Sequence, residues 1–193
     1  MTDRLNAQMS FLLEADRLKS ILRATPIADD SRRENSAEHS WHLALFALVL
    51  QEHGDDVSID RVIRMLLLHD IVEIDAGDNP IYGAKDDAAI ALREQAAADR
   101  IFGLLPDDQA AEFRALWEEF EANETQDARF AKSLDRFQPP NLNLASGGGS
   151  WRDYSVTFDM FEQAVGRKIA HGAPRLWDWI APKAQAFLAK LSG

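Results

Sequence analysis

The sequence predicts an all-α fold, and three observations lead to this prediction. Apolar residues recur at intervals of three and four along most of the 193 residues, which is the spacing of one face of a helix. No segment alternates polar and apolar residues long enough to indicate a strand. Alanine, leucine and charged residues, which favour helices, fill the most regular segments. The length suits one sizeable core, so we expect a single domain over residues 1–193.

The first predicted helix covers residues 4–23, where leucine, isoleucine and methionine recur at helical spacing between charged residues. A second begins at Asn35 or Ser36, because an asparagine followed three residues later by Glu38 matches a variant of the capping box. The apolar run LALFALVL follows this start, and Gly54 is expected to end the helix.

The remaining helices are predicted from similar patterns. A third runs from about residue 58 to 73 and ends before Gly77. The alanine-rich segment 86–105 is a strong helix former, and Pro106 suits the first turn of the next helix. Further helical segments are expected at 124–137, 151–170 and 174–191. The segment NLNLASGGGSW, before the last two helices, is predicted to be a flexible connection.

Composition argues against several classes of protein. The formal net charge is −11, so binding of long nucleic acid through its phosphates is not expected. A small phosphorylated ligand is compatible with this charge, because a few local cations or a metal act at short range. The longest apolar run is too short to span a bilayer, and MTDRLNAQMS lacks the apolar region of a secretory signal. Because the chain also has no cysteine, we expect a cytoplasmic protein.

One segment, LLLHDIVEIDAGDNP at 66–80, places several charged residues directly after an apolar run. In a helix, His69, Asp70 and Glu73 are three or four positions apart, so these side chains can project toward one region. An imidazole beside a carboxylate is a ligand mixture that suits a divalent transition metal. Glu73 is then placed to contact water at the metal, and Asp78 to reach over a ligand from the loop.

A histidine–aspartate pair alone is weak support for a metal site, because a helix-end salt bridge is its more common role. Two further residues strengthen the interpretation. His39 opens the second predicted helix in SAEHSWH, and Asp135 lies in KSLDRF. His42 is interpreted as a half-buried or supporting residue, because the other four already complete a site.

This ordered set resembles the HD-domain metal phosphohydrolases, and within them the YfbR/HDDC2-like 5′-deoxynucleotidase group. The shared motifs are RENSAEHS, LLLHD with its following acidic residues, LDRF and SGGGSW. The resemblance covers about residues 5–170 and implies one HD domain, a helical bundle completed by C-terminal helices over 151–192. It also implies a homodimer, for which the 86–105 helix and the aromatic C-terminal helices could supply a face.

The resemblance further implies roles for individual residues. The metal ligands would be His39, His69, Asp70 and Asp135, and the catalytic carboxylates would be Glu73, near the attacking water, and Asp78, near the leaving oxygen. The substrate contacts would be Arg23 at the phosphate, then Asn79, Pro80 and Ile81. Lys132 lies one turn before Asp135 and faces either the phosphate or solvent. Ala24 follows Arg23 where YfbR has tryptophan, so selection between deoxyribose and ribose is not determined.

The implied function is a divalent-metal-dependent 5′-nucleotidase that releases phosphate from (deoxy)nucleoside 5′-monophosphates. The metal would be Co²⁺, Mn²⁺, Fe²⁺, Ni²⁺ or Zn²⁺, all of which accept histidine and aspartate ligands. Two alternatives stay open. One is an HD-type phosphodiesterase or nucleotide pyrophosphohydrolase, and the other is a helical metal- or nucleotide-binding module without turnover.

Overall fold

The structure, a computed structural model, describes residues 2–83 and 86–191 and is built mainly of helices. Its α-helices are α1 (Thr2–Ala15), α2 (Ser36–Leu50), α3 (Ile59–Leu68), α4 (Glu73–Ala76), α5 (Asp87–Phe102), α6 (Asp107–Ala122), α7 (Gln126–Ala145), α8 (Gly149–Asp153), α9 (Phe158–Phe161), α10 (Arg167–Gly172) and α11 (Pro174–Leu191). Two 3₁₀ segments, Asp16–Ser20 and Gln51–His53, and one π-helical segment, Glu162–Gly166, extend them. The all-α prediction is confirmed, and a small hairpin is added to it.

The hairpin pairs β1 (Leu22–Pro26) with β2 (Arg33–Asn35) in antiparallel order. The predicted helix over 4–23 continues from α1 as a 3₁₀ segment to Ser20 and is wrong only over its last residues, where Arg23 lies on a strand. The physical reason is a tertiary contact. The backbone of β1 pairs with β2, and the Ile21 carbonyl accepts from the Ser36 amide at 3.0 Å instead of closing a helical turn.

The predicted helix over 58–73 is also divided. It ends at Leu68, and residues 69–72 form turns before α4 begins. The Glu73 amide donates to the Asp70 carbonyl at 2.9 Å, and the Ile71 amide donates to that of Leu68 at 3.2 Å. These bonds span three residues rather than four, so the chain tightens where the histidine–aspartate pair lies.

The longest helix, α7, continues beyond the predicted limit at residue 137 and takes in Asn141 to Ala145. The glycine run after it is not a flexible connection. Gly147, Gly148 and Gly149 all have positive φ, and a Cβ on Gly149 would lie 2.5 Å from Oδ1 of Asn143. Only glycine fits this compact turn, which leads directly into α8.

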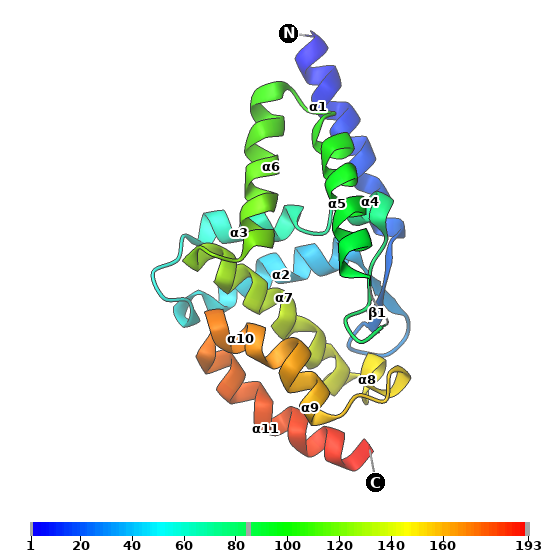
Figure 1. The fold of residues 1–193 in the computed structure, drawn as a ribbon, viewed down its shortest axis with the longest axis vertical. Helices are drawn as coiled ribbons and strands as arrows, with labels where there is room; N and C mark the ends of the chain where they lie inside the picture. The colour runs from blue at the N-terminus through cyan, green and yellow to red at the C-terminus, as the bar shows by residue number, and fades with distance from the viewer. Residues whose placement is uncertain (1, 84–85, 192–193) are drawn as a thin grey trace.

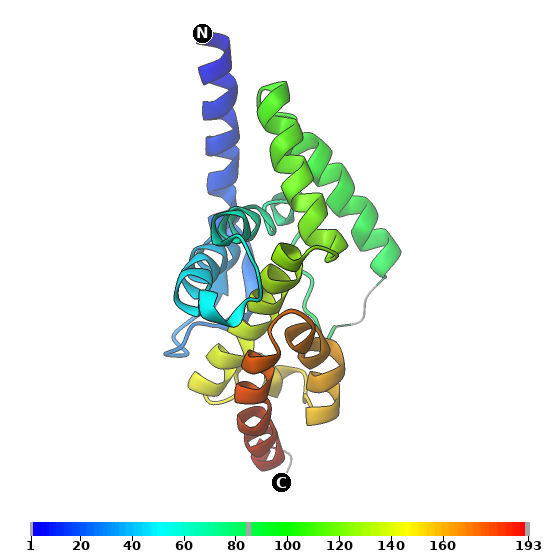
Figure 2. The same ribbon diagram turned by 90° about the vertical axis from the view of Figure 1, so that its left-hand side faces the viewer.

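Helix α7 forms the centre of the molecule (Figures 1 and 2). It packs against α2, α3, α6, α10 and α11. Figure 1 shows α1, α5 and α6 on one side of it and the C-terminal helices on the other. Large side chains that α7 and its neighbours bury together are Trp117, Phe120, Phe130, Leu134 and Phe161. Among the described residues, no helix is long and apolar enough to cross a membrane.

Candidate metal centre and active site

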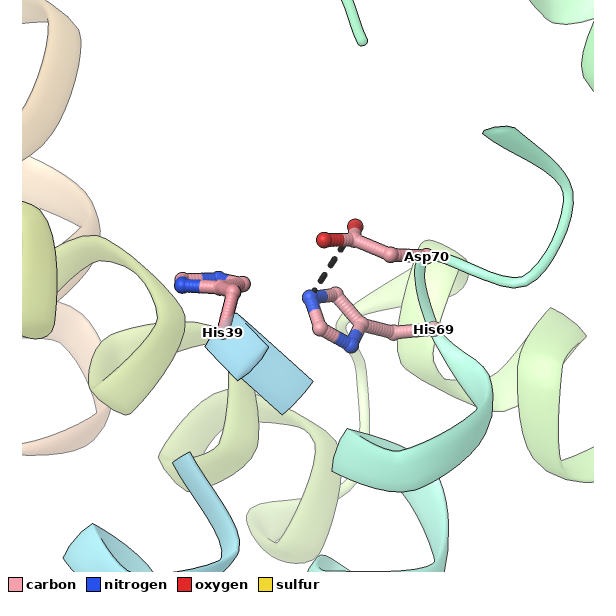
Figure 3. A group of neighbouring side chains, drawn as sticks. All are labelled: His39, His69 and Asp70. Atoms are coloured by element: carbon pink, nitrogen blue, oxygen red, sulfur yellow. Dashed lines mark ion pairs between the residues drawn. The ribbon is translucent and has the colours of Figure 1, made fainter. Parts of the chain in front are cut away.

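Three separate segments bring the predicted metal ligands together beside α7. His39 lies in the first turn of α2, where the predicted capping box of Asn35 and Glu38 is present and fixes the start of the helix. His69 and Asp70 lie in the turn after α3, and Asp135 lies in the middle of α7. Figure 3 shows His39, on α2, across from His69 and Asp70, whose ion pair is drawn as a dashed line.

The side chains are buried and within reach of a common ion. One ligand atom each from His39, His69 and Asp70 lies within 4.8 Å of the others. Oδ1 of Asp135 lies 3.1 Å from Nε2 of His39 and 3.7 Å from Nε2 of His69. Oδ1 of Asp70 lies 3.0 Å from the same nitrogen of His69. The structure therefore brings all four predicted ligands together.

The orientation of His69 fits a metal ligand. Its Nδ1 lies 2.8 Å from the Leu66 carbonyl, and a carbonyl can only accept, so Nδ1 carries the proton in the neutral ring. Nε2 is then left with a lone pair, and it is buried without an aligned hydrogen bond to any described residue. Two imidazole nitrogens and two carboxylates form a donor set that a divalent transition metal accepts, so these residues fit the group.

The predicted catalytic carboxylates border the same centre, and Arg23 joins them. Nη1 of Arg23 donates to Oδ2 of Asp70 at 2.5 Å and lies 3.9 Å from Oε1 of Glu73 and 3.8 Å from Oδ1 of Asp78. The Ser36 hydroxyl donates to Oε2 of Glu73 at 2.6 Å, which orients that carboxylate.

Burial and charge separate the pKa values of these groups. Burial raises the pKa of Glu73 well above its ordinary value, and the neighbouring Asp70 adds to the rise. Burial also raises the pKa of Asp78. Burial opposes ionisation of Asp135 as well, but Arg136, His39 and His69 hold its pKa well below the ordinary value. One carboxylate of the centre is thus kept anionic, while two at its edge favour a proton.

The pKa of His39 results from opposing influences. Burial of the ring and the charge of Arg23 favour the neutral form, but contacts with Asp135 and Glu34 raise the pKa to about 9. The ring is therefore held between two carboxylates, one on each nitrogen.

A cavity of about 210 Å³ opens beside the centre. The segment Asn79, Pro80 and Ile81 lines it, as predicted for the substrate loop, and so does Lys132. The Lys132 ammonium lies 2.9 Å from Oε1 of Glu121 and 3.8 Å from the centre of the Phe120 ring. It therefore faces the cavity wall rather than open solvent.

Three residues of the centre were not predicted from the sequence. Glu34 directly precedes the predicted start of the second helix, and in the structure it lies on β2 and is only 2% exposed. The other two are Ser36, which donates to Glu73, and Arg136, which lies 3.6 Å from Asp135. Neither carried a sequence signal beyond its proximity to the motifs. The sequence carries no signal for the burial of Glu34, because Arg33, Glu34 and Asn35 are all polar and their alternation in burial shows only in the folded strand.

His42 lies outside the centre. Its Nδ1 is 3.1 Å from Nε2 of Gln138, and its ring contacts Phe46 edge to face. The interpretation of His42 as a half-buried supporting residue agrees with this position. Two of the tryptophans, Trp117 and Trp151, are buried and line the cavity, whereas Trp41 and Trp179 are about half exposed or more.

The fold and site together define a class of protein, an α-helical domain in which two histidines and two aspartates meet in a buried centre beside a polar cavity. The model of the HD domain family matches residues 15–177. The chain belongs to the HD domain family.

Comparison with known proteins adds two kinds of relative. The 5′-deoxynucleotidase HDDC2 of Homo sapiens is 31% identical over 129 residues, which cover 66% of this chain and 62% of that protein. The Mus musculus protein of that name is 34% identical over 103 residues, covering 53% and 51%. The chain thus matches between half and about three fifths of the length of these curated relatives.

Solved structures share more of the chain. The crystal structure of a predicted metal-dependent phosphohydrolase from Magnetospirillum magnetotacticum MS-1 is 51% identical, with a TM-score of 0.87, and covers 98% of this chain and 96% of that one. A protein from Pyrococcus horikoshii OT3 is 18% identical with a TM-score of 0.65 over 93% of this chain and 99% of that one, a likeness that concerns the fold alone.

Proposed function

We propose that this protein is a divalent-metal-dependent 5′-nucleotidase that hydrolyses (deoxy)nucleoside 5′-monophosphates to nucleoside and phosphate. The observation that carries the proposal is the convergence of His39, His69, Asp70 and Asp135 next to Glu73 and Asp78 at one cavity. Similarity to proteins named 5′-deoxynucleotidase and metal-dependent phosphohydrolase supports it.

The four proposed ligands would hold one divalent ion. Such an ion, when bound, supplies Lewis acidity that lowers the pKa of water and neutralises charge on a phosphate. The anionic state of Asp135 and the free Nε2 of His69 suit this role. Phosphate release after separate addition of Co²⁺, Mn²⁺, Fe²⁺, Ni²⁺ and Zn²⁺ would identify which of these ions supports activity.

The two edge carboxyls would divide the proton transfers. Burial and Asp70 raise the pKa of Glu73, and the hydrogen bond from Ser36 opposes only part of that rise, so the carboxylate is a stronger base than an ordinary glutamate once its proton has left. An ionised Glu73 would orient the attacking water and accept its proton. Asp78, whose pKa is raised by burial, would hold a proton and donate it to the leaving O5′ of the nucleotide.

Arg23 would bind the phosphate and place it for attack. Its side chain is largely buried, and its guanidinium can offer two parallel donors to phosphate oxygens. Arg23 lies on β1, a strand held by β2, so the donor is carried by a fixed element. Asn79, Pro80, Ile81 and Lys132 line the remaining cavity and would contact the nucleoside or the phosphate.

A metal-by-nucleotide screen tests the proposal. Metal-stripped protein should release phosphate from dAMP or dGMP only after addition of one of the five divalent ions. Asp135→Asn should lose both metal binding and phosphate release. Undiminished activity after chelation and dialysis would contradict a metal-dependent mechanism, and release only from diesters or triphosphates would contradict a 5′-nucleotidase.

Comparison of AMP with dAMP in the same screen addresses the sugar. Ala24 lies beside Arg23 and lines the cavity with a small side chain. We expect this space to accept a 2′-hydroxyl, so AMP should be hydrolysed within about tenfold of dAMP. Ala24→Trp should then reduce hydrolysis of AMP more than that of dAMP. An equal effect on both nucleotides would contradict this assignment.

We also propose that the protein is a homodimer, with one face formed by α1 and α2. These helices lie on the same side of the molecule, at the left of Figure 2. Each exposes large apolar side chains spaced by three and four: Leu5, Met9, Leu12 and Leu13 on α1, and Trp41, Leu45, Leu48 and Val49 on α2. A two-fold dimer brings the same surface from both copies together, so a mainly apolar face can cover itself.

Molar mass in solution tests this assembly. Leu48→Glu should convert a dimer into a monomer in size-exclusion chromatography with light scattering. Leu92→Glu is the matched comparison, because Leu92 is an exposed leucine on α5, a helix that the sequence had suggested for the dimer face. Dissociation by Leu92→Glu alone would move the proposed interface to α5, and a monomeric wild type would contradict a dimer.

Two broader proposals accompany these. We propose that residues 1–193 act as one HD domain, since α11 packs on α7 and α10 and thus on the same core as the site. We propose a cytoplasmic location, in keeping with a chain without cysteine that acts on small nucleotides. Limited proteolysis and cell fractionation would test them.

A further inference from the structure

Glu34 is a buried carboxylate without a role in the steps above. It lies on β2, next to the start of α2, and is 2% exposed. A buried carboxylate is unfavourable unless nearby groups compensate its charge. The contacts of Glu34 therefore indicate what it does.

Its two oxygens face different partners. Oε1 accepts a hydrogen bond from Nε2 of Gln138 at 2.7 Å. Oε2 lies 3.2 Å from Nδ1 of His39, and 3.9 Å from Nε of Arg23. On the other side of the His39 ring, Nε2 faces Asp135 at 3.1 Å. Glu34 thus contacts one ring nitrogen of His39, and the candidate ligand Asp135 contacts the other.

A histidine binds a metal through one ring nitrogen, and the partner of the other nitrogen decides which one carries the proton. A carboxylate beside Nδ1 favours the N–H on that atom and leaves the lone pair on Nε2. We propose that Glu34 is a positioning residue, held by Gln138, that directs Nε2 of His39 to the divalent ion. This inference rests on the proposed metal centre.

Gln138 suits the supporting role because it is fully buried and lies one turn after Asp135 on α7. Its amide nitrogen also lies 3.1 Å from Nδ1 of His42, so both amide hydrogens have acceptors. Burial lowers the pKa of His42, which favours the neutral ring that such an acceptor requires. One helix therefore supplies both a candidate ligand and the residue that holds Glu34.

The first test measures Mn²⁺ affinity of the metal-stripped full chain by isothermal titration calorimetry. Glu34→Gln keeps the size of the side chain and removes its charge, and we expect affinity about 10–100-fold weaker. Glu112→Gln is the matched control, because Glu112 is an exposed glutamate on α6 that pairs with Arg64 and is not among the residues that line the cavity, and it should change affinity by less than about twofold.

An exchange of the two residues separates position from charge. The double variant Glu34→Gln/Gln138→Glu keeps the net charge and the buried amide–carboxyl pair, but moves the carboxylate away from His39 toward His42. Affinity should stay weak in this variant. Restored affinity would show that only negative charge near the centre matters and would overturn the positioning role.

A spectroscopic measurement on the wild type does not depend on any variant folding. In the Zn²⁺-loaded protein, ¹⁵N spectra of the histidine rings should show His39 protonated at Nδ1, with a proton shifted downfield by the carboxylate. Metal-bound Nδ1 would overturn the proposal. Melting of each metal-free variant reports on its folding separately.

The outcomes distinguish this inference from the proposed function. If wild-type protein binds no Mn²⁺, the metal centre and the role of Glu34 both fall. If wild-type protein binds tightly and Glu34→Gln binds equally well, only the role of Glu34 is overturned, and the metal-dependent function stands.

Discussion

Replacing Gly149 by alanine should destabilise the protein strongly for a change of one methyl group. Gly149 has a φ of +39°, and an added Cβ would lie 2.5 Å from Oδ1 of Asn143 and 2.8 Å from the ring of Pro26. The same Oδ1 accepts from the amide of Ser150 at 3.0 Å, so relief of the clash breaks a buried hydrogen bond.

The magnitude follows from these two effects. A left-handed backbone conformation costs a non-glycine residue about 1–2 kcal/mol. A buried hydrogen bond left unmade costs about 1–3 kcal/mol more. The free energy of unfolding should therefore fall by about 2–5 kcal/mol. At roughly 2–4 °C per kcal/mol for a chain of this size, the melting temperature should fall by about 4–20 °C.

Thermal unfolding followed by circular dichroism at 222 nm measures the loss, and Gly147→Ala is the matched control. Gly147 has a φ of +69°, and an added Cβ would have nothing within 4 Å, so only the backbone cost of about 1–2 kcal/mol applies. If Gly149→Ala and Gly147→Ala lowered the melting temperature equally, the clash with Asn143 and Pro26 would be refuted as a cause.

Three further predictions concern the cavity. Glu73→Gln should reduce phosphate release from dAMP by about 10²–10⁴-fold while metal binding stays unchanged; loss of metal binding in this variant would contradict a role restricted to proton transfer. Lys132→Met should raise the KM for dAMP by about 10–100-fold with kcat nearly unchanged, and an unaltered KM would exclude substrate contact. Burial and the neighbouring Glu121 raise the pKa of Glu94 in the folded chain. The protonated side chain is therefore tolerated at low pH, and the free energy of unfolding falls as pH rises through the raised pKa and the side chain ionises. Glu94→Gln should therefore raise the melting temperature at pH 7 and leave it unchanged near pH 3, and a gain at both pH values would point to packing instead.

The site could be predicted from the sequence because its ligands lie in compact motifs. His39 follows a capping box that fixes the start of α2, and the pair His69 and Asp70 follows a buried apolar segment. Asp135 required more than local reasoning, because no pattern within α7 indicates contact with residues 96 positions away. The assignment of Asp135 as a metal ligand depended on the resemblance of the ordered set of motifs rather than on local spacing.

The parts that sequence reasoning missed depend on tertiary contacts. The hairpin strands are too short to show alternation, and the helical spacing of apolar residues up to Leu22 does not reveal that β1 pairs with β2. Nothing near Glu34 in the sequence indicates its burial, because its partner Gln138 lies 104 residues further on. The glycine run looked flexible, whereas all three glycines have positive φ and the close contacts of Gly149 with Asn143 and Pro26 leave no room for a side chain there.

The hairpin also determines where the chain can be lengthened. Its tip, residues 28–32, is exposed, so an inserted loop or peptide tag there would extend into solvent. The strands allow no such freedom, because successive side chains alternate between faces. A single residue inserted between Glu34 and Asn35 would shift Glu34 by one position and turn its side chain from the interior to the surface. The inserted residue would then take the place of Glu34 beside His39. Natural length variation and engineered insertions should therefore accumulate at the tip of the hairpin, with both strands kept at fixed length.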